Sequence, residues 1–531
     1  MRQFIIGAAA VAALSVGGQA FAKNLTICTE GSPEQLSPHV SESGTTLNTV
    51  NNVYERLVRF KPGTTELQPS LAEKWDVSDD GKAFTFHLRH GVKFQSTDSF
   101  KPTRDFNADD VVATFERMWK KDSPYYKLSA SYDYFGDMDM PNLLSKITKV
   151  DDYTVRFDLT APNAPFLADL AMDFAAIDSK EYLDAMLKAG KGDQVDWNPV
   201  GTGPYQFVAY QKDAVIRYKR NETYWGDKPA FDTVAYVIAK DSAVRKAKLE
   251  AGECDIMTYP AAPDVKSLEA NPNITVLHQA GLNALYLYLN VTKPYLSDKR
   301  VRQAISMAVD KDAIVKAVYQ GLGQVAVNPI PPTMWAWNQN VKPYPYDPEA
   351  AKKLLKAAGV PDGYEFELWA QPVQRPYNPD GKKIAELLQS DLAKVGLKGK
   401  IVTYEWGEYR KRLGNHEGQI SQMGWTGDNG DPDNFLNTLF ACPAARIGGG
   451  NYSAWCDPKT GFSQLLVEAA NTADQAKRKA LYDKAQVIFH EEAPAVPIAH
   501  STTSWPVSKK IKGFVVDPLD HILLSGVDKT E

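Results

Sequence analysis

The sequence lacks a long hydrophobic run beyond its first residues and lacks an excess of basic residues. No later stretch approaches the ~18 consecutive apolar residues of a membrane-spanning helix, so we expect no transmembrane domain. Its 60 Lys and Arg residues are outnumbered by 65 Asp and Glu residues, and the net charge is −5. Nucleic-acid-binding surfaces need clustered Lys and Arg. We therefore expect no nucleic-acid partner.

The motifs of common hydrolases and nucleotide-binding enzymes are also missing. The chain contains no Gly-x-Ser-x-Gly elbow and no Gly-x4-Gly-Lys loop. The segment that starts at His490 lacks a second histidine at i+4, and its proline would interrupt the helix that such zinc ligands require. His87 and His90 fall on a predicted strand, where a separation of three directs side chains to opposite faces. We expect no enzymatic activity, no cofactor and no metal site.

Cysteine is scarce, with four residues at Cys28, Cys254, Cys442 and Cys456. Four cysteines allow three connectivities. Cys442 and Cys456 are near neighbours joined by a Gly-rich loop, so we predict a local disulfide there, which leaves a long-range disulfide between Cys28 and Cys254. A metal site does not fit, because there is no C-x-x-C spacing and no nearby histidine pair. The acidic run 428–434 resembles a calcium loop only loosely, and we interpret it as a turn in which Asx side chains bond their own backbone.

The first 22 residues have the layout of a signal peptide. Arg2 precedes a short apolar run from Phe4 to Val16, and the segment ends in Ala20-Phe21-Ala22. We expect cleavage after Ala22 and export of the mature chain to an oxidising compartment, where the cysteines can pair. The alternative is a retained membrane anchor. Lipidation is not expected, because the first mature residue would be Lys23 and not cysteine.

Residue periodicity divides the rest of the chain into a β-rich part and an α/β part. Alternating residues predict strands at 71–78, 84–88 and 152–160, with an Asp-Gly turn at 79–82. Asn107 begins a predicted helix with acidic residues in its first turn. Farther along, predicted helices alternate with predicted strands, which argues for an α/β lobe: helices at 301–309, 348–358, 382–395 and 408–413, strands at 365–369 and 400–404, and a Pro-rich loop at 329–337.

Several segments resemble the family of peptide- and nickel-binding extracytoplasmic solute receptors, and the resemblance covers essentially the whole mature chain. The family-wide segments are 72–94, 106–111, 198–205, 217–226 and 301–304 with Asp310-Lys311. Three more segments resemble the members that bind dipeptides: 372–379, 403–409 and 424–435.

The resemblance implies an α/β fold of the periplasmic-binding-protein kind, a two-lobed clamp with the ligand cleft between the lobes. Carried over to this numbering, domain I comprises 23–54, 205–282 and 500–531, a β-rich domain II is inserted at 55–204, and an α/β domain III spans 283–499. Residues 1–22 are the signal peptide. The implied function is the substrate-binding component of an ABC importer, which captures dipeptides or short peptides in the periplasm. Its partners would be the permease subunits and a chemoreceptor, and the protein would be a monomer.

The resemblance also implies the binding residues. Asp428 would pair with the ammonium group of a dipeptide and Arg375 with its carboxylate, a chemistry in which charge-assisted bonds recognise both ends at once. Trp425, Thr426 and Gly427 would line the cleft beside Asp428, with Pro376 and Tyr377 beside Arg375, and Glu42 on the opposite wall. Glu42 replaces an uncharged residue of dipeptide-binding members. The alternatives are a receptor for oligopeptides, haem or a metal chelate, and a secreted peptidase.

Overall fold

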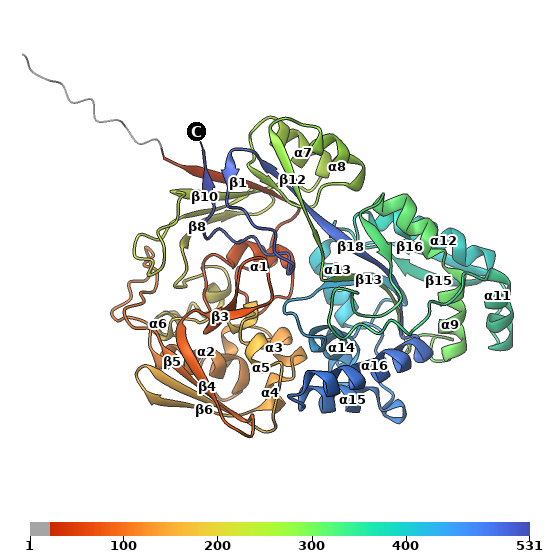
Figure 1. The fold of residues 1–531 in the computed structure, drawn as a ribbon, viewed down its shortest axis with the longest axis horizontal. Coiled ribbons are helices and arrows are strands. Elements are labelled where there is room, and N and C mark those ends of the chain that lie inside the picture. Colours follow the sequence, from red (N-terminus) through yellow and green to blue (C-terminus); the bar gives the residue numbers. More distant parts are fainter. Residues whose placement is uncertain (1–21, 531) are drawn as a thin grey trace, which may run out of the picture.

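The computed structural model describes residues 22–530 (Figure 1). The predicted signal peptide therefore lies almost wholly outside the described residues. Within residues 22–530, none of the helices has both the length and the apolar character needed to cross a bilayer.

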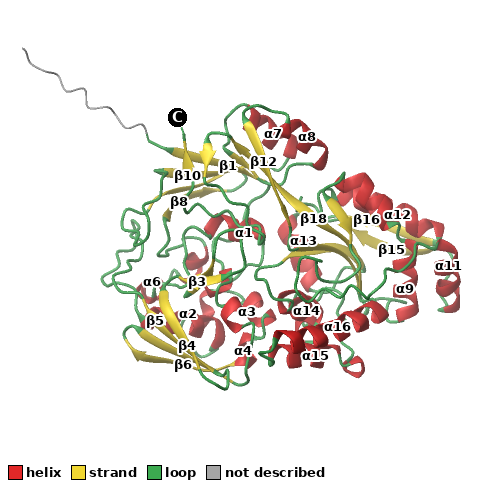
Figure 2. Ribbon diagram, in the orientation of Figure 1, coloured by secondary structure: helices red, strands yellow, loops and turns green. Residues whose placement is uncertain are grey.

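A 12-stranded sheet passes through both lobes of the molecule, with its path in the order β16-β15-β17-β13-β18-β11-β1-β10-β9-β8 (Figures 1 and 2). The first lobe holds one end of this sheet: β1 Asn24–Thr29, β8 Tyr205–Gln211, β9 Val215–Arg220, β10 Thr233–Ile238, β11 Ile256–Met257 and β12 Ile274–Ala280, with α1 Gly44–Val50, α7 Ser242–Glu250 and α8 Ala262–Glu269. The short strands β19 Ile511–Lys512 and β20 Asp528–Lys529 pair with each other.

The second lobe holds the other end of the sheet and most of the long helices. Its elements are β13 Asn283–Leu289, α9 Lys299–Ala308, α10 Lys311–Ile314, β14 Gly323–Val325, α11 Pro348–Ala357, β15 Tyr364–Trp369, α12 Gly381–Lys394, β16 Leu397–Val402, α13 Trp406–Gly414, β17 Ile420–Thr426, α14 Asp433–Phe440, α15 Phe462–Ala470 and α16 Gln475–Glu492. The helices and strands predicted from periodicity in this region are confirmed to within a few residues, and 329–337 is a loop.

Strand β18, Ala495–Ser508, belongs to both lobes (Figure 1). Its first part pairs with β13 and β14, and its second part pairs with β12 and β11. The chain crosses between the lobes a second time from β12 to β13. At this crossing Asn283 contacts β18, because its Oδ1 accepts a hydrogen bond from the Ser501 backbone N–H at 2.9 Å. At Gly281 an added Cβ would lie 2.9 Å from the Ser501 carbonyl oxygen, so glycine permits this close approach.

The β-rich part of the first lobe is a four-stranded antiparallel sheet in the order β4-β5-β7-β6. The three predicted strands are confirmed as β4 Ala72–Val77, β5 Ala83–Leu88 and β7 Thr154–Leu159, and β6 Leu144–Asp151 is an addition. Helix α2, Ala108–Trp119, begins with a capping box in which Asn107 and Asp110 exchange hydrogen bonds. The remaining elements are β2 Val58–Phe60, β3 Leu67–Pro69, α3 Asp133–Asp137, α4 Met140–Leu143, α5 Phe166–Asp169 and α6 Lys180–Lys188. The division of the chain into three domains stays a prediction.

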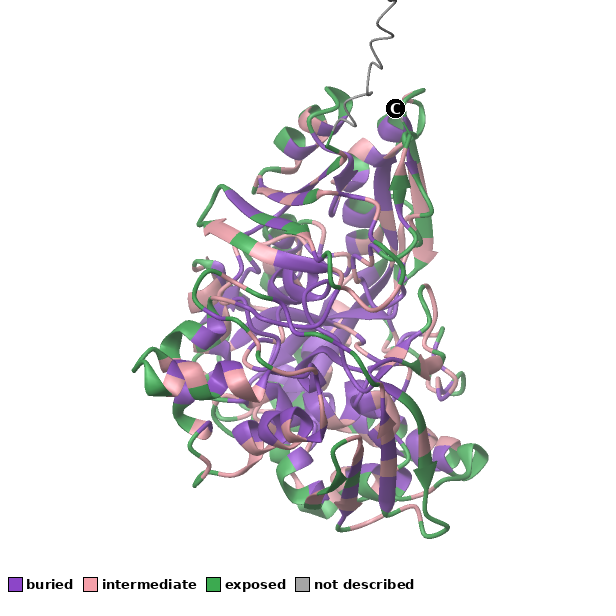
Figure 3. Ribbon diagram, turned by 90° about the vertical axis from the view of Figure 1, so that its left-hand side faces the viewer, coloured by how far each residue is buried: buried purple, intermediate pink, exposed green. Residues whose placement is uncertain are grey.

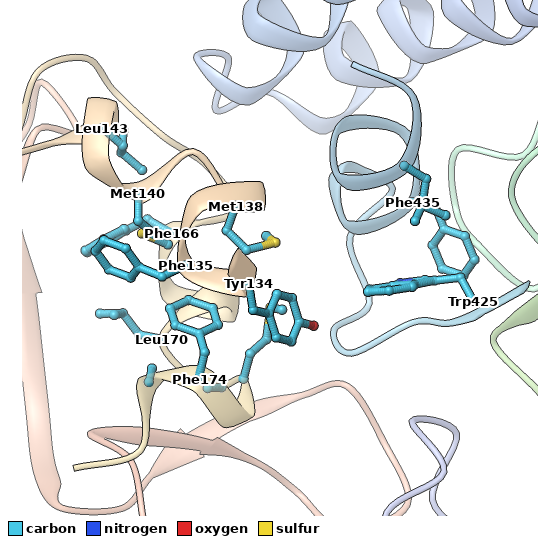
Figure 4. Close-up of a cluster of buried hydrophobic side chains, with 14 of the residues drawn as sticks. Tyr134, Phe135, Met138, Met140, Leu143, Phe166, Leu170, Phe174, Trp425 and Phe435 are labelled. Atoms are coloured by element: carbon cyan, nitrogen blue, oxygen red, sulfur yellow. The ribbon is translucent and has the colours of Figure 1, made fainter. Parts of the chain in front are cut away.

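Buried residues concentrate in the middle of the molecule in the view of Figure 3. One hydrophobic cluster continues from the first lobe into the second. In Figure 4, Tyr134 and Phe174 lie on one side and Trp425 and Phe435 on the other. The rings of Tyr134 and Trp425 meet edge to face, with centroids 6.1 Å apart. The lobes are therefore in apolar contact beside the cleft.

Both predicted disulfides are confirmed. Cys28 on β1 is bonded to Cys254, which precedes β11, and their Cα atoms lie 5.8 Å apart. Cys442 and Cys456 close a short loop after α14, with Cα atoms 4.7 Å apart.

We predict that replacing Cys28 and Cys254 together by serine lowers the free energy of unfolding by about 2–5 kcal/mol, because the disulfide limits the freedom of a long unfolded loop. Chemical denaturation followed by circular dichroism measures the change. A reducing agent should destabilise the native protein more than it destabilises the double variant. If a thiol titration of the native protein found four free thiols, both disulfides would be contradicted.

Candidate functional site

A cavity with about 630 Å³ of space free of protein atoms, partly open to solvent, lies between the lobes. The first lobe contributes α1, the residues just before it, Tyr259 and the segment 519–521. The second lobe contributes the loop after β15, the end of β17 with the loop after it, part of α13, and Tyr452. The lining residues are Glu42, Ser43, Gly44, Leu47, Asn48, Tyr259, Arg375, Tyr377, Trp406, Arg410, Met423, Gly424, Trp425, Thr426, Asp428, Tyr452, Leu519, Asp520 and His521.

The structure brings six of the eight predicted binding residues together in this cavity: Glu42, Arg375, Tyr377, Trp425, Thr426 and Asp428. Pro376 lines a second cavity that adjoins the first, and both cavities share Tyr259, Arg375 and Asp520. Gly427 lines neither. It packs against Phe435, whose ring would lie 2.7 Å from an added Cβ, and its N–H donates to the Leu282 carbonyl at 2.7 Å.

Asp428 is held in place by side chains that bond the backbone of its own loop. Its N–H donates to Asn434 Oδ1 at 2.9 Å, and the same oxygen accepts from Trp425 Nε1 at 3.0 Å. Within the loop, Asn429 Oδ1 accepts from the Asp431 N–H at 2.9 Å, and Asp431 Oδ1 accepts from the Asp433 N–H at 3.0 Å. The predicted Asx turn is therefore confirmed.

The Asp428 carboxyl group lines the cavity. Its Oδ2 is buried and has no hydrogen-bond partner within residues 22–530. Burial raises the pKa of Asp428 to about 7, and the neighbouring Tyr134 hydroxyl opposes this shift only in part. A buried carboxylate without a partner is costly, so a positively charged ligand group at Oδ2 would offset this cost.

Arg375 lies in the loop after β15. The backbones of Arg375 and Asn378 exchange two hydrogen bonds of 3.0 Å, which close a tight turn. The turn is tied to the rest of the lobe by the Asn378 amide, which donates to Gln422 Oε1 at 3.0 Å. The guanidinium group crosses to the first lobe, where Nη1 lies 2.8 Å from Glu30 Oε1 and Nη2 donates to Thr45 Oγ1 at 2.7 Å.

Part of the hydrogen-bonding capacity of Arg375 is unused within residues 22–530. A guanidinium group has five N–H donors, and Nη1 uses its two on Glu30 and on the Gln374 carbonyl. Nη2 uses one on Thr45. The Nε–H and the second Nη2–H have no partner in the part of the chain that the structure describes, and these two donors form one edge of the guanidinium plane. That edge fits the two oxygens of a carboxylate.

Glu30 is the buried counter-ion of Arg375, and only 5% of its surface is exposed. Burial alone would raise the pKa of Glu30, but Arg375 and the hydrogen bonds around the carboxylate outweigh it, and the pKa is lowered. The hydroxyl groups of Thr29, Thr45 and Thr258 donate to its oxygens at 2.8, 2.9 and 3.0 Å. The Glu30 carboxylate is therefore charged, and protein hydrogen-bond donors surround it in place of water.

Glu42 faces the second lobe at the other side of the cavity. Its Oε2 accepts from Arg410 Nη2 at 3.3 Å, and its Oε1 is buried without a hydrogen-bond partner among the described residues. Burial raises the pKa of Glu42. Burial also raises the pKa of Asp137 well above its usual value, and the charge of Glu42 adds to this shift, while Asp137 pairs with Arg446 of the second lobe.

The predicted binding residues did not include Glu30, Thr45, Arg410, Asp520 or His521. A signal existed for Glu30. It directly follows strand β1, and ligands of α/β sheets bind beyond the carboxyl ends of the strands. Arg375 and Asp428 follow β15 and β17 in the same way. In residues 22–530 no group of three or more His, Cys, Asp or Glu side chains is arranged to hold a metal ion.

Comparison with known proteins identifies the family. Residues 66–446 match the family described as bacterial extracellular solute-binding proteins, family 5 Middle. The chain belongs to this family. A relative within it is the dipeptide-binding protein of Escherichia coli (strain K12), which is 55% identical over 509 residues that cover 96% of this chain and 95% of the relative.

Solved structures of family members share the fold. The dipeptide-binding protein of Pseudoalteromonas sp. SM9913 in complex with Met-Leu is 39% identical, with a TM-score of 0.92, and the match covers 96% of this chain and 100% of that chain. A periplasmic binding protein associated with an ABC transporter of Helicobacter pylori, in complex with the peptide STSA, is 40% identical, with a TM-score of 0.91, over 96% and 99% of the two chains. The two-lobed clamp is therefore a periplasmic-binding-protein fold, as predicted.

We predict that Asp428→Asn stabilises the ligand-free protein at pH 8 but not at pH 4. Because the folded-state pKa of about 7 lies above the ordinary value, the unfolded chain loses the proton first and stability falls as the pH rises from about 4 to about 7. Asparagine cannot ionise and so removes the cost of a charged carboxylate in the folded protein. We expect this cost to be about 2 kcal/mol, because water that enters the cleft reduces it. Thermal unfolding at both pH values measures it. The exposed Asp79→Asn is the matched control, and an equal effect at pH 4 and pH 8 would contradict the assignment.

Proposed function

We propose that this protein captures dipeptides or short peptides in the periplasm and delivers them unchanged to the permease of an ABC importer. The observation that carries the proposal is one cavity in which, among residues 22–530, Asp428 Oδ2 has no hydrogen-bond partner and one edge of the Arg375 guanidinium group makes no hydrogen bond. A free dipeptide carries one ammonium and one carboxylate group, and these are the two groups that such partners bind. The names of the relatives, two of them bound to peptides, support it.

The remaining lining gives the ligand an apolar and aromatic surface. Trp406 and Tyr259 flank the Arg375 guanidinium, with ring centroids 5.1 and 5.6 Å from its Cζ. Trp425 and Tyr377 complete the wall near Asp428 and Arg375. Such surfaces exclude water from the ion pairs and thereby strengthen them. Thr426 also lines the cavity, and we assign Gly427 and Pro376 a supporting place beside it.

Closure of the clamp couples capture to transport. Arg375 and Asp428 belong to the second lobe, whereas Glu30, Thr45 and Glu42 belong to the first, so the contacts of the closed cleft form only when the lobes meet. The two crossings at Gly281–Asn283 and within β18 are the segments about which the lobes rotate. A ligand that bridges the lobes binds the closed form more tightly than the open form, and it therefore shifts the equilibrium toward the closed form. The permease then recognises the closed protein.

The remaining parts of the proposal concern location and partners. Export follows from the signal-peptide layout of residues 1–22, with cleavage after Ala22. The protein acts as a monomer, without a cofactor and without catalysis, and a chemoreceptor is a further partner.

Arg375→Ala should weaken the binding of Ala-Ala by about 2–5 kcal/mol, the usual cost of removing one partner of a buried charge pair. Isothermal calorimetry with Ala-Ala, its C-terminal amide and its N-acetyl form tests this assignment. The native protein should bind both analogues more weakly than Ala-Ala. In Arg375→Ala, the difference between Ala-Ala and the amide should disappear, whereas the penalty for N-acetylation should remain.

Two controls separate ligand binding from the Glu30 contact. Arg156→Ala, at an exposed position on β7, should bind Ala-Ala normally. The double variant Arg375→Ala with Glu30→Gln removes the stranded Glu30 charge. If this double variant binds Ala-Ala with native affinity, or if Arg375→Ala still discriminates against the amide, Arg375 does not bind the peptide carboxylate.

Incubation of the native protein with Ala-Ala should return intact dipeptide, and multiple turnovers to free alanine would support a peptidase instead. Native mass spectrometry of the freshly purified protein should find peptide-sized ligands. A bound mass equal to haem or to a long oligopeptide would favour those alternatives.

A further inference from the structure

The cavity contains more acid than a neutral dipeptide needs. Three carboxyl groups line it, on Glu42, Asp428 and Asp520, against two guanidinium groups, on Arg375 and Arg410. Both guanidinium groups already have an acid beside them that is not a cavity residue: Glu30 lies 2.8 Å from Arg375, and Glu34 lies 3.8 Å from Arg410. One acid, Asp428, is assigned to the ligand ammonium. Binding of a zwitterion would leave the negative charge of the cavity unchanged.

Of the other two acids, Glu42 pairs with Arg410, whereas Asp520 forms no ion pair within residues 22–530. Asp520 is 7% exposed and lines both the central cavity and the adjoining one. Its Oδ2 accepts a hydrogen bond of 2.6 Å from the Tyr259 hydroxyl, and its Oδ1 is buried with no partner within residues 22–530. The backbone of Asp520 is in the left-handed region, with φ of 65°, and its N–H donates to the Asp517 carbonyl at 3.0 Å.

The groups around Asp520 place it at the Arg375 end of the cavity. Tyr259 bonds Asp520 and lies with its ring centroid 5.6 Å from the Arg375 guanidinium carbon. Arg375 and Asp520 line both cavities, so a dipeptide with its carboxylate on Arg375 would have its second residue at the Asp520 end of the central cavity. The adjoining cavity offers the side chain of that residue mixed surroundings, with Tyr319, Leu322 and Trp505 beside Ser501 and Thr503. An aliphatic stem with a charged end suits such a wall.

We infer that Asp520 is a specificity-determining residue that binds the cationic side chain of the carboxyl-terminal residue, so that the preferred ligands are dipeptides ending in lysine or arginine. This inference rests on the proposed function, because it assumes the peptide orientation that Arg375 and Asp428 impose. An ammonium or guanidinium group would give Asp520 Oδ1 the partner that it lacks and would reduce the excess negative charge of the closed cleft.

The titration of Asp520 agrees with this role. Burial raises the pKa of Asp520 to about 7, Glu30 contributes in the same direction, and Tyr259, Arg375 and His521 act against it. His521 does not neutralise Asp520 permanently, because burial lowers the pKa of His521 and its Nε2 lies 3.0 Å from Asp173. A cationic ligand group therefore meets a carboxyl group that ionises readily near neutral pH.

Calorimetry at pH 8 with Ala-Lys and Ala-norleucine tests the inference, since norleucine has the lysine chain without its ammonium group. We expect the native protein to bind Ala-Lys more tightly by about tenfold to a hundredfold, the range of a charge-assisted hydrogen bond. In Asp520→Asn this ratio should fall to near one. Asparagine tolerates positive φ, and Asp520→Gly, which accepts it freely, is a second variant with the same expected result. The exposed Asp79→Asn, a matched loss of one charge, should keep the native ratio.

The outcomes distinguish this inference from the proposed function. If the native protein binds Ala-norleucine and Ala-Lys equally, or if the ratio survives in both Asp520 variants, the inference is wrong and dipeptide capture stands. If Lys-Ala is preferred over Ala-Lys and the preference is lost in Glu42→Gln, the cationic side chain belongs to the other end of the cleft and Asp520 is not its partner. If no dipeptide binds, the proposed function fails and the inference fails with it.

Discussion

The buried ion pair between Glu30 and Arg375 joins the two lobes at the centre of the cleft. Removing both charges from water is costly, and the pair is tolerable only because three threonine hydroxyls complete the shell of Glu30 and the Gln374 carbonyl accepts from Arg375. The pair also fixes the orientation of the guanidinium plane, and so decides which edge of Arg375 faces a ligand. Arg375 therefore takes part in two contacts at once: it pairs with Glu30 of the first lobe, and it lines the cavity.

The same arrangement explains why an acidic cavity is compatible with folding. The carboxyl groups of Asp428 and Asp520 have pKa values near 7 and can hold protons when no ligand is bound. In the proposed complex, the ligand ammonium displaces the proton of Asp428 and a cationic side chain displaces that of Asp520, so that each cation meets one charged partner on closure. The apolar contact between Tyr134 and Trp425 stabilises the meeting of the lobes independently of these charges. Closure thus combines a constant hydrophobic contribution with an electrostatic contribution that depends on the ligand.

Local patterns predicted the elements whose causes are local. The capping box of Asn107 and Asp110 and the alternation along β5 and β7 depend on neighbouring residues, and both were predictable. Strand β6 has mostly exposed residues and little alternation, so no pattern marked it. Strand β18 was missed because Pro497 and Pro506 argue against an interior strand. Arg375 and Asp428 were found only through family resemblance. The contact of Arg375 with Glu30 spans 345 residues, and no local signal encodes it.

Strand β18 has a consequence for how the chain is made. Because residues 495–508 pair with strands of both lobes, the 12-stranded sheet cannot be completed until almost the whole chain has been synthesised. Contacts this distant in sequence form slowly, so the growing chain keeps incomplete sheet edges throughout its synthesis. An exported protein benefits from such a delay, since a polypeptide that has not yet folded can still be threaded through a narrow translocation channel. Strand β18, which joins the lobes in the native structure, therefore also determines when the native structure can form.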